Sequence, residues 1–278
     1  MHVWTLPYVN TARSYLRRAG ITQLIGAPAR VRNRVRRAWY AAAHPTVVNT
    51  RVNRSAAAML VADETEFVRV MSYREDRAII EALLATLSQG DVYWDVGASI
   101  GLYVTLVAAH VGSTGGVVAF EPEPRSNARL RENVRANAFT NVQVFDVALG
   151  RAAGTMELHF AEHFTAGSHT LFASSATAPS TGAVSVTVAT GDRFREEVGL
   201  CSPNAIKIDV EGAEEDVIEG LSVTLAEPTC RAVLCEVHFA LLEARGHRDA
   251  PARIERTLGS LGYRHVRWID HSHLLATK

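Results

Sequence analysis

The sequence predicts an α/β fold built around a mostly parallel, doubly wound sheet, and two observations carry this prediction. Residues 92–96 form a short run of β-branched and aromatic residues, a loop with two spaced glycines follows, and residues 102–111 are typical of an apolar helix. The same order of strand, loop and helix recurs at 116–138 and again from residue 205 onward. Strands that alternate with helices are typical of a sheet covered by helices on both faces.

Composition sets the broad class of the protein. With 278 residues and 47% hydrophobic residues, the chain is long enough to bury a substantial core. Its cysteines are Cys201, Cys230 and Cys235, an odd number without a Cys-x-x-Cys pair, which argues against a disulfide framework. They indicate a reducing compartment, so we expect a cytoplasmic protein. No uninterrupted apolar stretch approaches the roughly 18 residues of a membrane-spanning helix, so no membrane span is expected.

An arginine-rich extension, residues 1–54, precedes the main domain that we expect at residues 55–278. The extension holds ten arginines, and the first acidic residue of the chain is Asp63. Such a segment can contact nucleic acid, an anionic membrane or an acidic partner. Because few aromatic residues interleave with the arginines, we do not expect nucleic acid as the partner. We expect a helical extension that is either solvated or pairs two copies of the chain as a homo-oligomer.

The main domain is predicted to begin with two short strands and a helix. Residues 56–61 and 66–71 are interpreted as strands on either side of an acidic turn. Residues 76–87 carry apolar residues at helical spacing, and this helix ends before Gly90. These elements lead into the strand at 92–96.

The glycine loop after that strand is predicted to bind a nucleoside. Gly97 and Gly101 can let a ligand approach the backbone closely, and Asp95 can accept hydrogen bonds from it. The spacing Gly-x-x-x-Gly lacks the middle glycine with which Gly-x-Gly-x-x-Gly loops receive a pyrophosphate. A nucleoside without a pyrophosphate therefore fits better than a dinucleotide.

Two further strand ends are predicted to carry ligand-binding acids. The strand at 116–120 ends in Glu121 and Pro122, and Glu121 stands where a carboxylate can take both hydroxyls of a ribose. A third strand at 142–147 places Asp146 where an adenine edge can be read. An acid at a strand end can also be a helix cap, but acids at three successive strand ends favour a binding site.

The α/β order breaks down in an insertion at about 151–191. Residues 155–160 and 184–190 alternate like antiparallel strands, and the segment between them is rich in Ser, Thr, Ala and Gly. Long insertions in compact domains are often functional. We interpret this one as a hairpin or lid facing the substrate, with His163, Ser168 and His169 as candidate contacts.

The last third of the chain supplies a second group of acids. The strand at 205–208 runs into Asp209 and Glu211, which we assign to the pocket, whereas Glu214 and Glu215 are explained by the dipole of the helix that follows. Asp192 is predicted to be an N-cap. The strand at 231–235 is followed by Glu236 and His238, which point to the same side because side chains alternate along a strand. Residues 263–269 and 273–277 are expected to close the chain as an antiparallel pair.

Taken together, these motifs resemble the FkbM family of S-adenosylmethionine-dependent methyltransferases, over about residues 73–238. The motifs are Asp95-Val-Gly-Ala-Ser-Ile-Gly101, Phe120-Glu121-Pro122, Asn137 before the third strand, Lys207-Ile-Asp-Val-Glu-Gly-Ala-Glu214 and Glu236-Val-His238. The resemblance implies a class I methyltransferase fold with a seven-stranded sheet and one antiparallel strand. Members with known roles mostly methylate hydroxyls of sugars, polyketides and other natural products, so a small-molecule hydroxyl acceptor is expected.

The resemblance also assigns the cofactor site. Asp95, Gly97 and Gly101 are expected to hold the methionine part and Glu121 the ribose. Ser99 departs from the family pattern, which usually has Asn at that position. The complete set expected to contact the cofactor is Asp95, Gly97, Ala98, Ser99, Gly101, Glu121, Pro122, Asp146, Val147 and Asp209.

A weakly acidic hydroxyl needs a base that removes its proton during transfer. His238 is the first candidate because histidine titrates near neutral pH, and Glu236 and Asp209 are the next. His238 can instead be a structural residue. In another arrangement, Asp209, Glu236 and His238 bind Mg²⁺, although histidine is a poor Mg²⁺ ligand. Glu211, with Ser168 and His169 of the insertion, is expected to contact the acceptor.

Two other classes of function stay open. A nicotinamide-dependent oxidoreductase would need the missing middle glycine of the dinucleotide loop. An RNA-binding methyltransferase would use the arginine-rich extension, with binding that depends steeply on salt. No Asn-Pro-Pro-Tyr-like element for a flipped base is present.

Overall fold

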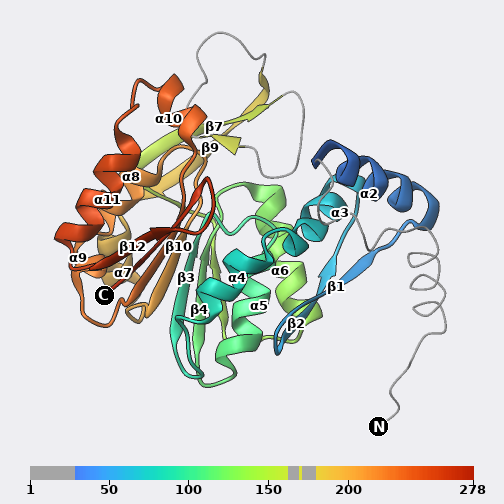
Figure 1. Cartoon of the computed structure of the whole chain (residues 1–278), viewed down its shortest axis with the longest axis horizontal. Coiled ribbons are helices and arrows are strands. Elements are labelled where there is room, and N and C mark those ends of the chain that lie inside the picture. The colour runs from blue at the N-terminus through green and yellow to red at the C-terminus, as the bar shows by residue number, and fades with distance from the viewer. Residues whose placement is uncertain (1–28, 162–168, 171–179) are drawn as a thin grey trace. The chain divides into compact units, whose positions relative to one another are not determined.

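The computed structural model of the chain (Figure 1) describes residues 29–161, 169–170 and 180–278, with residues 29–30, 159–161, 169–170 and 180–182 described by their backbone alone. The chain divides into two compact units, residues 1–45 and 46–278. In the first unit, helix α2 (Ala29–Ala43) carries five of the ten arginines of the expected extension: Arg30, Arg32, Arg34, Arg36 and Arg37. The predicted boundary at residue 54 falls between two paired strands of the second unit. Among the described helices, none is long and apolar enough to span a membrane.

The second unit contains the predicted seven-stranded sheet. Its strand order is β12-β13-β11-β10-β3-β4-β5, and only β13 runs antiparallel to its neighbours. This is the class I methyltransferase topology. The strands are β3 (Val92–Val96), β4 (Gly116–Phe120), β5 (Val142–Phe145), β10 (Ala205–Ile208), β11 (Ala232–Glu236), β12 (His265–Trp268) and β13 (His273–Thr277).

The register of the parallel strands brings their carboxyl ends to one edge of the sheet. Val96 pairs with Phe120 on one side and with Ile208 on the other, and Ile208 pairs with Cys235. The residues that come directly after these positions are Gly97, Glu121, Asp209 and Glu236. The polar groups singled out in the sequence therefore meet at this edge, where open parallel sheets place their ligands.

Helices cover both faces of this sheet (Figure 1). One face carries α4 (Arg77–Leu84), α5 (Leu102–Val111) and α6 (Pro124–Ala136), and the other carries α7 (Gly191–Val198), α8 (Glu214–Gly220), α9 (Ser222–Ala226) and α11 (Ala250–Ser260), while the short α10 (Phe239–Ala244) follows β11. Trp94 and Phe120 belong to a core cluster that also holds Val217 and Leu258. Burial of these apolar side chains is the main favourable term for folding.

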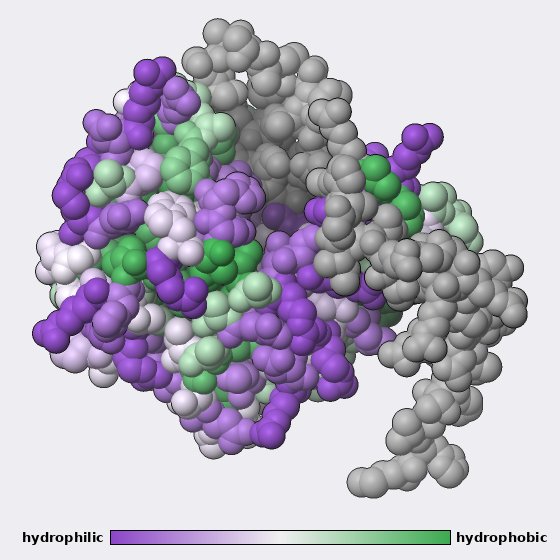
Figure 2. Space-filling model, in the orientation of Figure 1, coloured by the Kyte–Doolittle hydropathy of each residue, from purple (hydrophilic) through white to green (hydrophobic). Residues whose placement is uncertain are grey.

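The face of the molecule in Figure 2 is largely hydrophilic, with hydrophobic residues scattered among polar ones. In the second unit, the described large hydrophobic residues that are exposed are Val47, Val198, Val223 and Phe239. Single exposed apolar residues of this kind are normal for a protein surface.

One predicted strand is wrong, because residues 66–71 lie in helix α3 (Glu64–Met71). The hairpin before it consists of β1 (Val47–Val52) and β2 (Ser55–Leu60), and a short 3₁₀ helix, η2 (Ser72–Arg74), follows. The helix begins with a variant of the capping box: Oδ1 of the N-cap Asp63 accepts a hydrogen bond from the Glu66 N–H at 2.8 Å, and Oε2 of Glu66 accepts one from the N–H of Ala62, just before the N-cap, at 2.7 Å. The first bond satisfies an N–H group that a helix leaves without a partner, and the second fixes the chain that enters the helix. Together they favour the helix over the strand that the β-branched residues suggest.

Two asparagine side chains, Asn133 of α6 and its C-cap Asn137, fasten β2 to the end of that helix. The amide of Asn137 accepts a hydrogen bond from the Ala58 N–H at 2.8 Å and donates one to the Ala58 carbonyl at 2.7 Å. Asn133 accepts from the Leu60 N–H at 2.7 Å and donates to the Ile100 carbonyl at 2.8 Å. Side-chain amides thus make the hydrogen bonds that a neighbouring strand would make.

The insertion forms a separate four-stranded sheet, in the order β6-β9-β7-β8. Its strands are β6 (Ala148–Leu149), β7 (Gly154–Ala161), β8 (His169–Thr170) and β9 (Ser180–Ala189). The predicted antiparallel pair is confirmed, because β7 pairs with β9. Of the predicted acceptor contacts, His163 and Ser168 lie outside the described residues, as does the side chain of His169.

Two other predictions concern the last strands of the chain and a helix cap. The closing antiparallel pair, β12 with β13, is confirmed. Asp192, however, is not the N-cap of α7, which is Thr190. The Asp192 carboxylate instead accepts hydrogen bonds from the backbone N–H groups of Val223 and Thr224, each at 2.8 Å, and so caps the start of α9.

Candidate active site

Two neighbouring cavities open at the carboxyl edge of the main sheet. We call the first the β4 cavity; its wall is largely apolar, with Phe120, Pro122, Val147, Leu149 and Leu158, and it also holds the acids Glu121, Asp209 and Glu211. We call the second the β10 cavity; its wall is mostly polar and includes Ser72, Asp76, Tyr103, Lys207, Glu236 and His273. The two cavities share Arg69, Gly97, Ser99 and Asp209.

The loop after β3 is shaped by contacts inside the protein. Gly97 and Gly101 have positive φ angles of 84° and 89°, which favour glycine. A Cβ on Gly97 would lie 1.8 Å from the carbonyl oxygen of Asp209, and a Cβ on Gly101 would lie 2.3 Å from Cδ1 of Leu130. Gly97 lines both cavities, but at Gly101 the space is taken by Leu130, and Gly101 lines neither.

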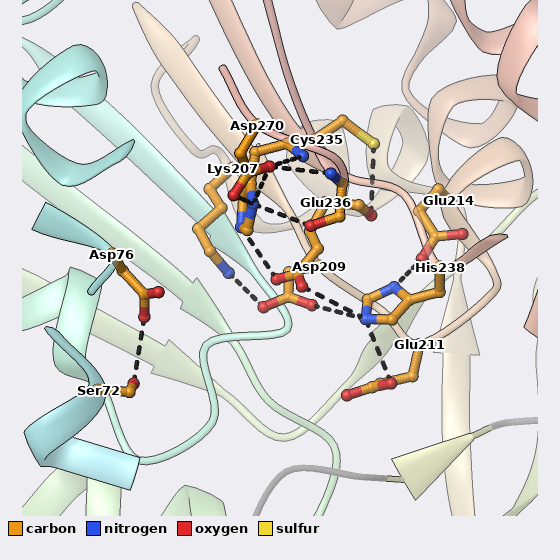
Figure 3. A network of polar contacts seen from close by, with 12 residues as sticks. Ser72, Asp76, Lys207, Asp209, Glu211, Glu214, Cys235, Glu236, His238 and Asp270 are labelled. Atoms are coloured by element: carbon orange, nitrogen blue, oxygen red, sulfur yellow. Dashed lines mark hydrogen bonds and ion pairs between the residues drawn. The ribbon is translucent and has the colours of Figure 1, made fainter. Parts of the chain in front are cut away.

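His238 lies at the centre of a group of carboxylates, as Figure 3 shows. Its Nδ1–H donates to Oε1 of Glu214 at 2.7 Å. Its Nε2 lies 3.3 Å from Glu211, 3.7 Å from Asp209 and 3.9 Å from Glu236. Because a carboxylate can only accept, the Glu214 contact fixes the proton on Nδ1 and leaves Nε2 facing the other acids.

This arrangement shifts the pKa values of the cluster. Burial lowers the pKa of His238, but its hydrogen bond to Glu214 and the charges of Glu211 and Asp209 outweigh burial and raise the pKa to about 9. Burial raises the pKa of Glu211 to about 7, although His238 opposes this shift. At neutral pH the imidazole is therefore mostly protonated in the free protein.

Lys207 connects this cluster to the loop after β3. Its Nζ donates to Oδ2 of Asp209 at 2.8 Å and lies 3.7 Å from Oδ1 of Asp95. It also sits over the ring of Tyr103, 4.8 Å from its centroid. Burial lowers the pKa of Lys207, but the two carboxylates outweigh burial and hold the pKa above its usual value, so the lysine stays charged. Burial likewise favours neutral Asp209, but Lys207 lowers its pKa on balance.

This combination of topology and acid-rich sheet edge agrees with the comparison with known proteins. Residues 95–265 match the family model described as the methyltransferase FkbM domain, which is more than half of the chain. The chain belongs to the FkbM methyltransferase family. It is an S-adenosylmethionine-dependent methyltransferase.

Two curated methyltransferases are among the relatives of this chain. The hexuronic acid methyltransferase AglP of Haloferax volcanii is 29% identical over 183 residues, which cover 66% of this chain and 71% of AglP. The 2-O-methyltransferase NoeI of Sinorhizobium fredii is 31% identical over 119 residues, which cover 39% of this chain and 48% of NoeI. The chain thus spans about half the length of NoeI.

A solved structure from the same family can also be superimposed. The FkbM methyltransferase from Methylobacillus flagellatus KT aligns with a TM-score of 0.47 and 15% sequence identity, and the alignment covers 79% of this chain and 56% of the solved one.

The buried polar atoms around the loop fit a bound cofactor. Asp95 is 1% exposed, yet neither of its carboxylate oxygens has a hydrogen-bond partner among the described residues, and the same holds for Oγ of Ser99. Buried polar groups without hydrogen-bond partners are uncommon in native proteins, and a missing ligand is one explanation for them. Burial raises the pKa of Asp95 to about 6, although Lys207 opposes this. A ligand that donates hydrogen bonds would stabilise the ionised form.

Glu121 is held in place by the backbone. Its two oxygens accept hydrogen bonds from the N–H groups of Ser99 at 2.6 Å and Glu123 at 2.8 Å. Each oxygen keeps a further lone pair for a ligand. Burial raises the pKa of Glu121 to about 7, against the effect of these two N–H groups. The carboxylate lines the β4 cavity, and its contact with the ribose stays a prediction.

The other residues predicted to contact the cofactor differ in whether they line a cavity. Ala98 lines the β10 cavity, and Pro122 and Val147 line the β4 cavity. Asp146 is exposed and lines neither cavity. Its contact with adenine therefore stays a prediction. Ser99 has a φ of 49°, a left-handed conformation in which Asn is enriched, which explains why Asn suits this position in the family.

Sequence reasoning missed several residues of the methyltransferase site. Arg69 was hidden by the wrong strand prediction for 66–71, although the spacing Asp63-x-x-Glu66 is a helix signal. Glu214, assigned to the helix dipole alone, also binds His238 and the Gly212 N–H. His273, which comes from the antiparallel strand, has its Nε2 3.2 Å from Glu236. Glu215 pairs with Arg253, outside both cavities.

Proposed function

We propose that this protein is an O-methyltransferase that transfers the methyl group of S-adenosylmethionine to a hydroxyl of a small molecule, most of all a sugar or a glycosylated or polyketide natural product. The observation that carries the proposal is the imidazole of His238, oriented by Glu214 at the sheet edge beside the two cavities. The names of AglP and NoeI, which state a hexuronic acid and a 2-O position, support a sugar hydroxyl as acceptor.

In this proposal the cofactor lies along the two cavities. Glu121 takes the ribose hydroxyls, and the apolar wall that includes Pro122 and Val147 packs on the adenine, near Asp146. The methionine part lies along the loop after β3, with Asp95 and Asp209 accepting its hydrogen bonds. This placement is supported by the hydrogen-bonding capacity that Asp95 and Glu121 retain.

When bound, the cofactor supplies an electrophilic methyl group on a sulfonium with a good leaving group. The protein has to align the acceptor oxygen and take its proton. We assign the proton to Nε2 of His238, because Nδ1 is held by Glu214. Glu236 and Asp209 are the next candidates for this role. Only the neutral form of His238 can accept a proton, so the raised pKa makes the rate rise with pH.

Acceptor binding is assigned to the insertion and to Glu211. Glu211 has a φ of 53°, and such a left-handed conformation in a non-glycine residue is often found at functional sites. Its carboxylate lines the β4 cavity and faces His238. Ser168 and His169 remain predictions for the same role, as does pairing of two copies through the extension.

A divalent metal remains an alternative for activating the hydroxyl. The predicted ligands were Asp209, Glu236 and His238; in the structure, ligand atoms of Asp209, Glu211 and His238 lie within 4.8 Å of one another. A metal there would replace the proton on Nε2 and polarise the acceptor oxygen. The family comparison gives no support for it.

The test is a screen with labelled S-adenosylmethionine against sugars, uronic acids, glycosylated polyketides and RNA. We expect label on a hydroxyl oxygen of a small molecule, located by mass spectrometry and NMR, and loss of it in His238→Ala. Label on a nitrogen or carbon atom, or on RNA alone, would contradict the proposal.

A further inference from the structure

Arg69, which projects from α3, is one of the residues that line both cavities. Its Nη1 is buried and has no hydrogen-bond partner among the described residues. The carboxylates of Asp209 and Glu121 act on it through space, but no ion pair to its guanidinium is found in the described part of the chain. A buried, unpaired donor facing a cavity points to a ligand that brings the acceptor.

The ligand group that fits this donor best is a carboxylate. A guanidinium is planar, stays charged in proteins and can donate two parallel hydrogen bonds to one carboxylate. The other basic residues of the β10 cavity already have acidic partners: Lys207 pairs with Asp209 and Asp95, and His273 pairs with Glu236. Arg69 is therefore the cation that remains for an anionic group in the described cavity wall.

The same cavity also suits a positive group. Asp76, which also lines the β10 cavity, accepts a hydrogen bond from Oγ of Ser72 at 3.1 Å, and burial raises its pKa. Glu236 lies 3.2 Å from Nε2 of His273. A ligand end with both an ammonium and a carboxylate matches these acids and Arg69 together. The aminoacyl end of the cofactor has this chemistry, whereas an acidic sugar brings the carboxylate without the ammonium.

We propose that Arg69 binds the aminoacyl carboxylate of S-adenosylmethionine. The proposal rests on the cofactor placement given under the proposed function and adds a residue from α3, outside the sheet edge, to that site. It also gives α3 a role in holding the cofactor: the guanidinium bridges the two cavities at the loop after β3.

The test compares two ligands that differ in one carboxylate. S-adenosylhomocysteine and its decarboxylated analogue, which keeps the adenosine, the thioether and the amine, are titrated into the protein by calorimetry. We expect the wild-type protein to bind S-adenosylhomocysteine at least about tenfold more tightly, as a charge-assisted hydrogen bond predicts. In Arg69→Ala and Arg69→Met this preference should disappear, through weaker binding of S-adenosylhomocysteine alone.

Controls separate this result from a general loss of structure. Arg77→Ala removes an exposed arginine of α4, which pairs with Glu81, and should keep the preference. Arg69→Met retains an apolar stem, and thermal unfolding without ligand shows whether each variant is folded. Equal weakening of both ligands, or a preference that survives in a folded Arg69 variant, overturns the assignment. Equal binding of both ligands by the wild-type protein also overturns it and leaves the proposed function intact, whereas binding of neither contradicts the cofactor placement itself.

Discussion

The two halves of the site differ in how far their polar groups already satisfy one another. At the loop after β3, Asp95 and Ser99 have buried oxygens, and Arg69 has a buried nitrogen, for which the described residues supply no hydrogen bond. At the ends of β10 and β11, both ring nitrogens of His238 face carboxylates. The first half is preorganised to receive a ligand. The second half holds a charged network whose charge state has to change before it can take a proton.

The largest effect should come from removing the imidazole. His238→Ala is expected to lower the rate of methyl transfer by about 10²–10⁴-fold, because a positioned general base contributes that much. Cofactor affinity, measured by calorimetry with S-adenosylhomocysteine, should stay nearly unchanged. His265→Ala, an exposed histidine on β12, is the matched control. Equal activity of the two variants would rule out His238 as the base and leave Glu236 or Asp209.

The charge state of the network can be read from the pH dependence of kcat/KM. Since the pKa of His238 is raised to about 9, activity should rise about tenfold per pH unit up to about pH 9. Glu214→Gln removes a charge that raises this pKa, so the rising limb should move to lower pH. Both hydrogen bonds to Glu214 end on Oε1, which Gln keeps, so the variant should fold. A profile with the same midpoint in both proteins would contradict the role of Glu214.

A smaller effect is expected on the cofactor side. Glu121→Gln should weaken S-adenosylhomocysteine binding by about tenfold, because a charged acceptor is replaced by a neutral amide. The pKa of Glu121 is raised to about 7, so protonation below that pH removes acceptor capacity. Wild-type affinity should therefore fall as pH is lowered from 8 to 5.5, and less so in the variant. Calorimetry at both pH values makes the comparison, and affinity that is flat with pH in both proteins would place the ribose elsewhere.

The smallest effect is expected from chelation. If His238 acts as a base, the charges of Asp209 and Glu211 are balanced by the imidazolium and Lys207, and activity should persist after exhaustive treatment with a chelator. Loss of activity that Mg²⁺ or another divalent ion restores would instead assign Asp209, Glu211 and His238 as ligands.

The positions at strand ends were predictable from the sequence, because two regularities determine them. Hydrophobic periodicity predicts the order of strands and helices. Because parallel strands in register end at the same edge of a sheet, Glu121, Asp209 and Glu236 meet there. Arg69 was not predictable in the same way. The β-branched residues around it favour a strand, and the capping box that decides for a helix involves only two side chains.

Other features depend on contacts between residues distant in the sequence. Gly97 is required by the carbonyl of Asp209, more than a hundred residues later in the chain. The orientation of Glu214 follows from the turn at Glu211 and Gly212, both with positive φ, and no periodic pattern encodes that turn. Local propensity therefore predicts the sheet and its edge, whereas the partners of the charged groups are set by tertiary packing.

The two asparagines at the end of α6, Asn133 and Asn137, also protect one edge of the hairpin formed by β1 and β2. An open strand edge invites pairing with a second chain, and natural proteins cover or blunt such edges. Asn133 and Asn137 occupy the hydrogen-bonding groups of Ala58 and Leu60, so one side of the amino-terminal hairpin is closed to intermolecular strand addition. A mutant lacking both amides would be expected to aggregate at concentrations where the natural chain stays dispersed.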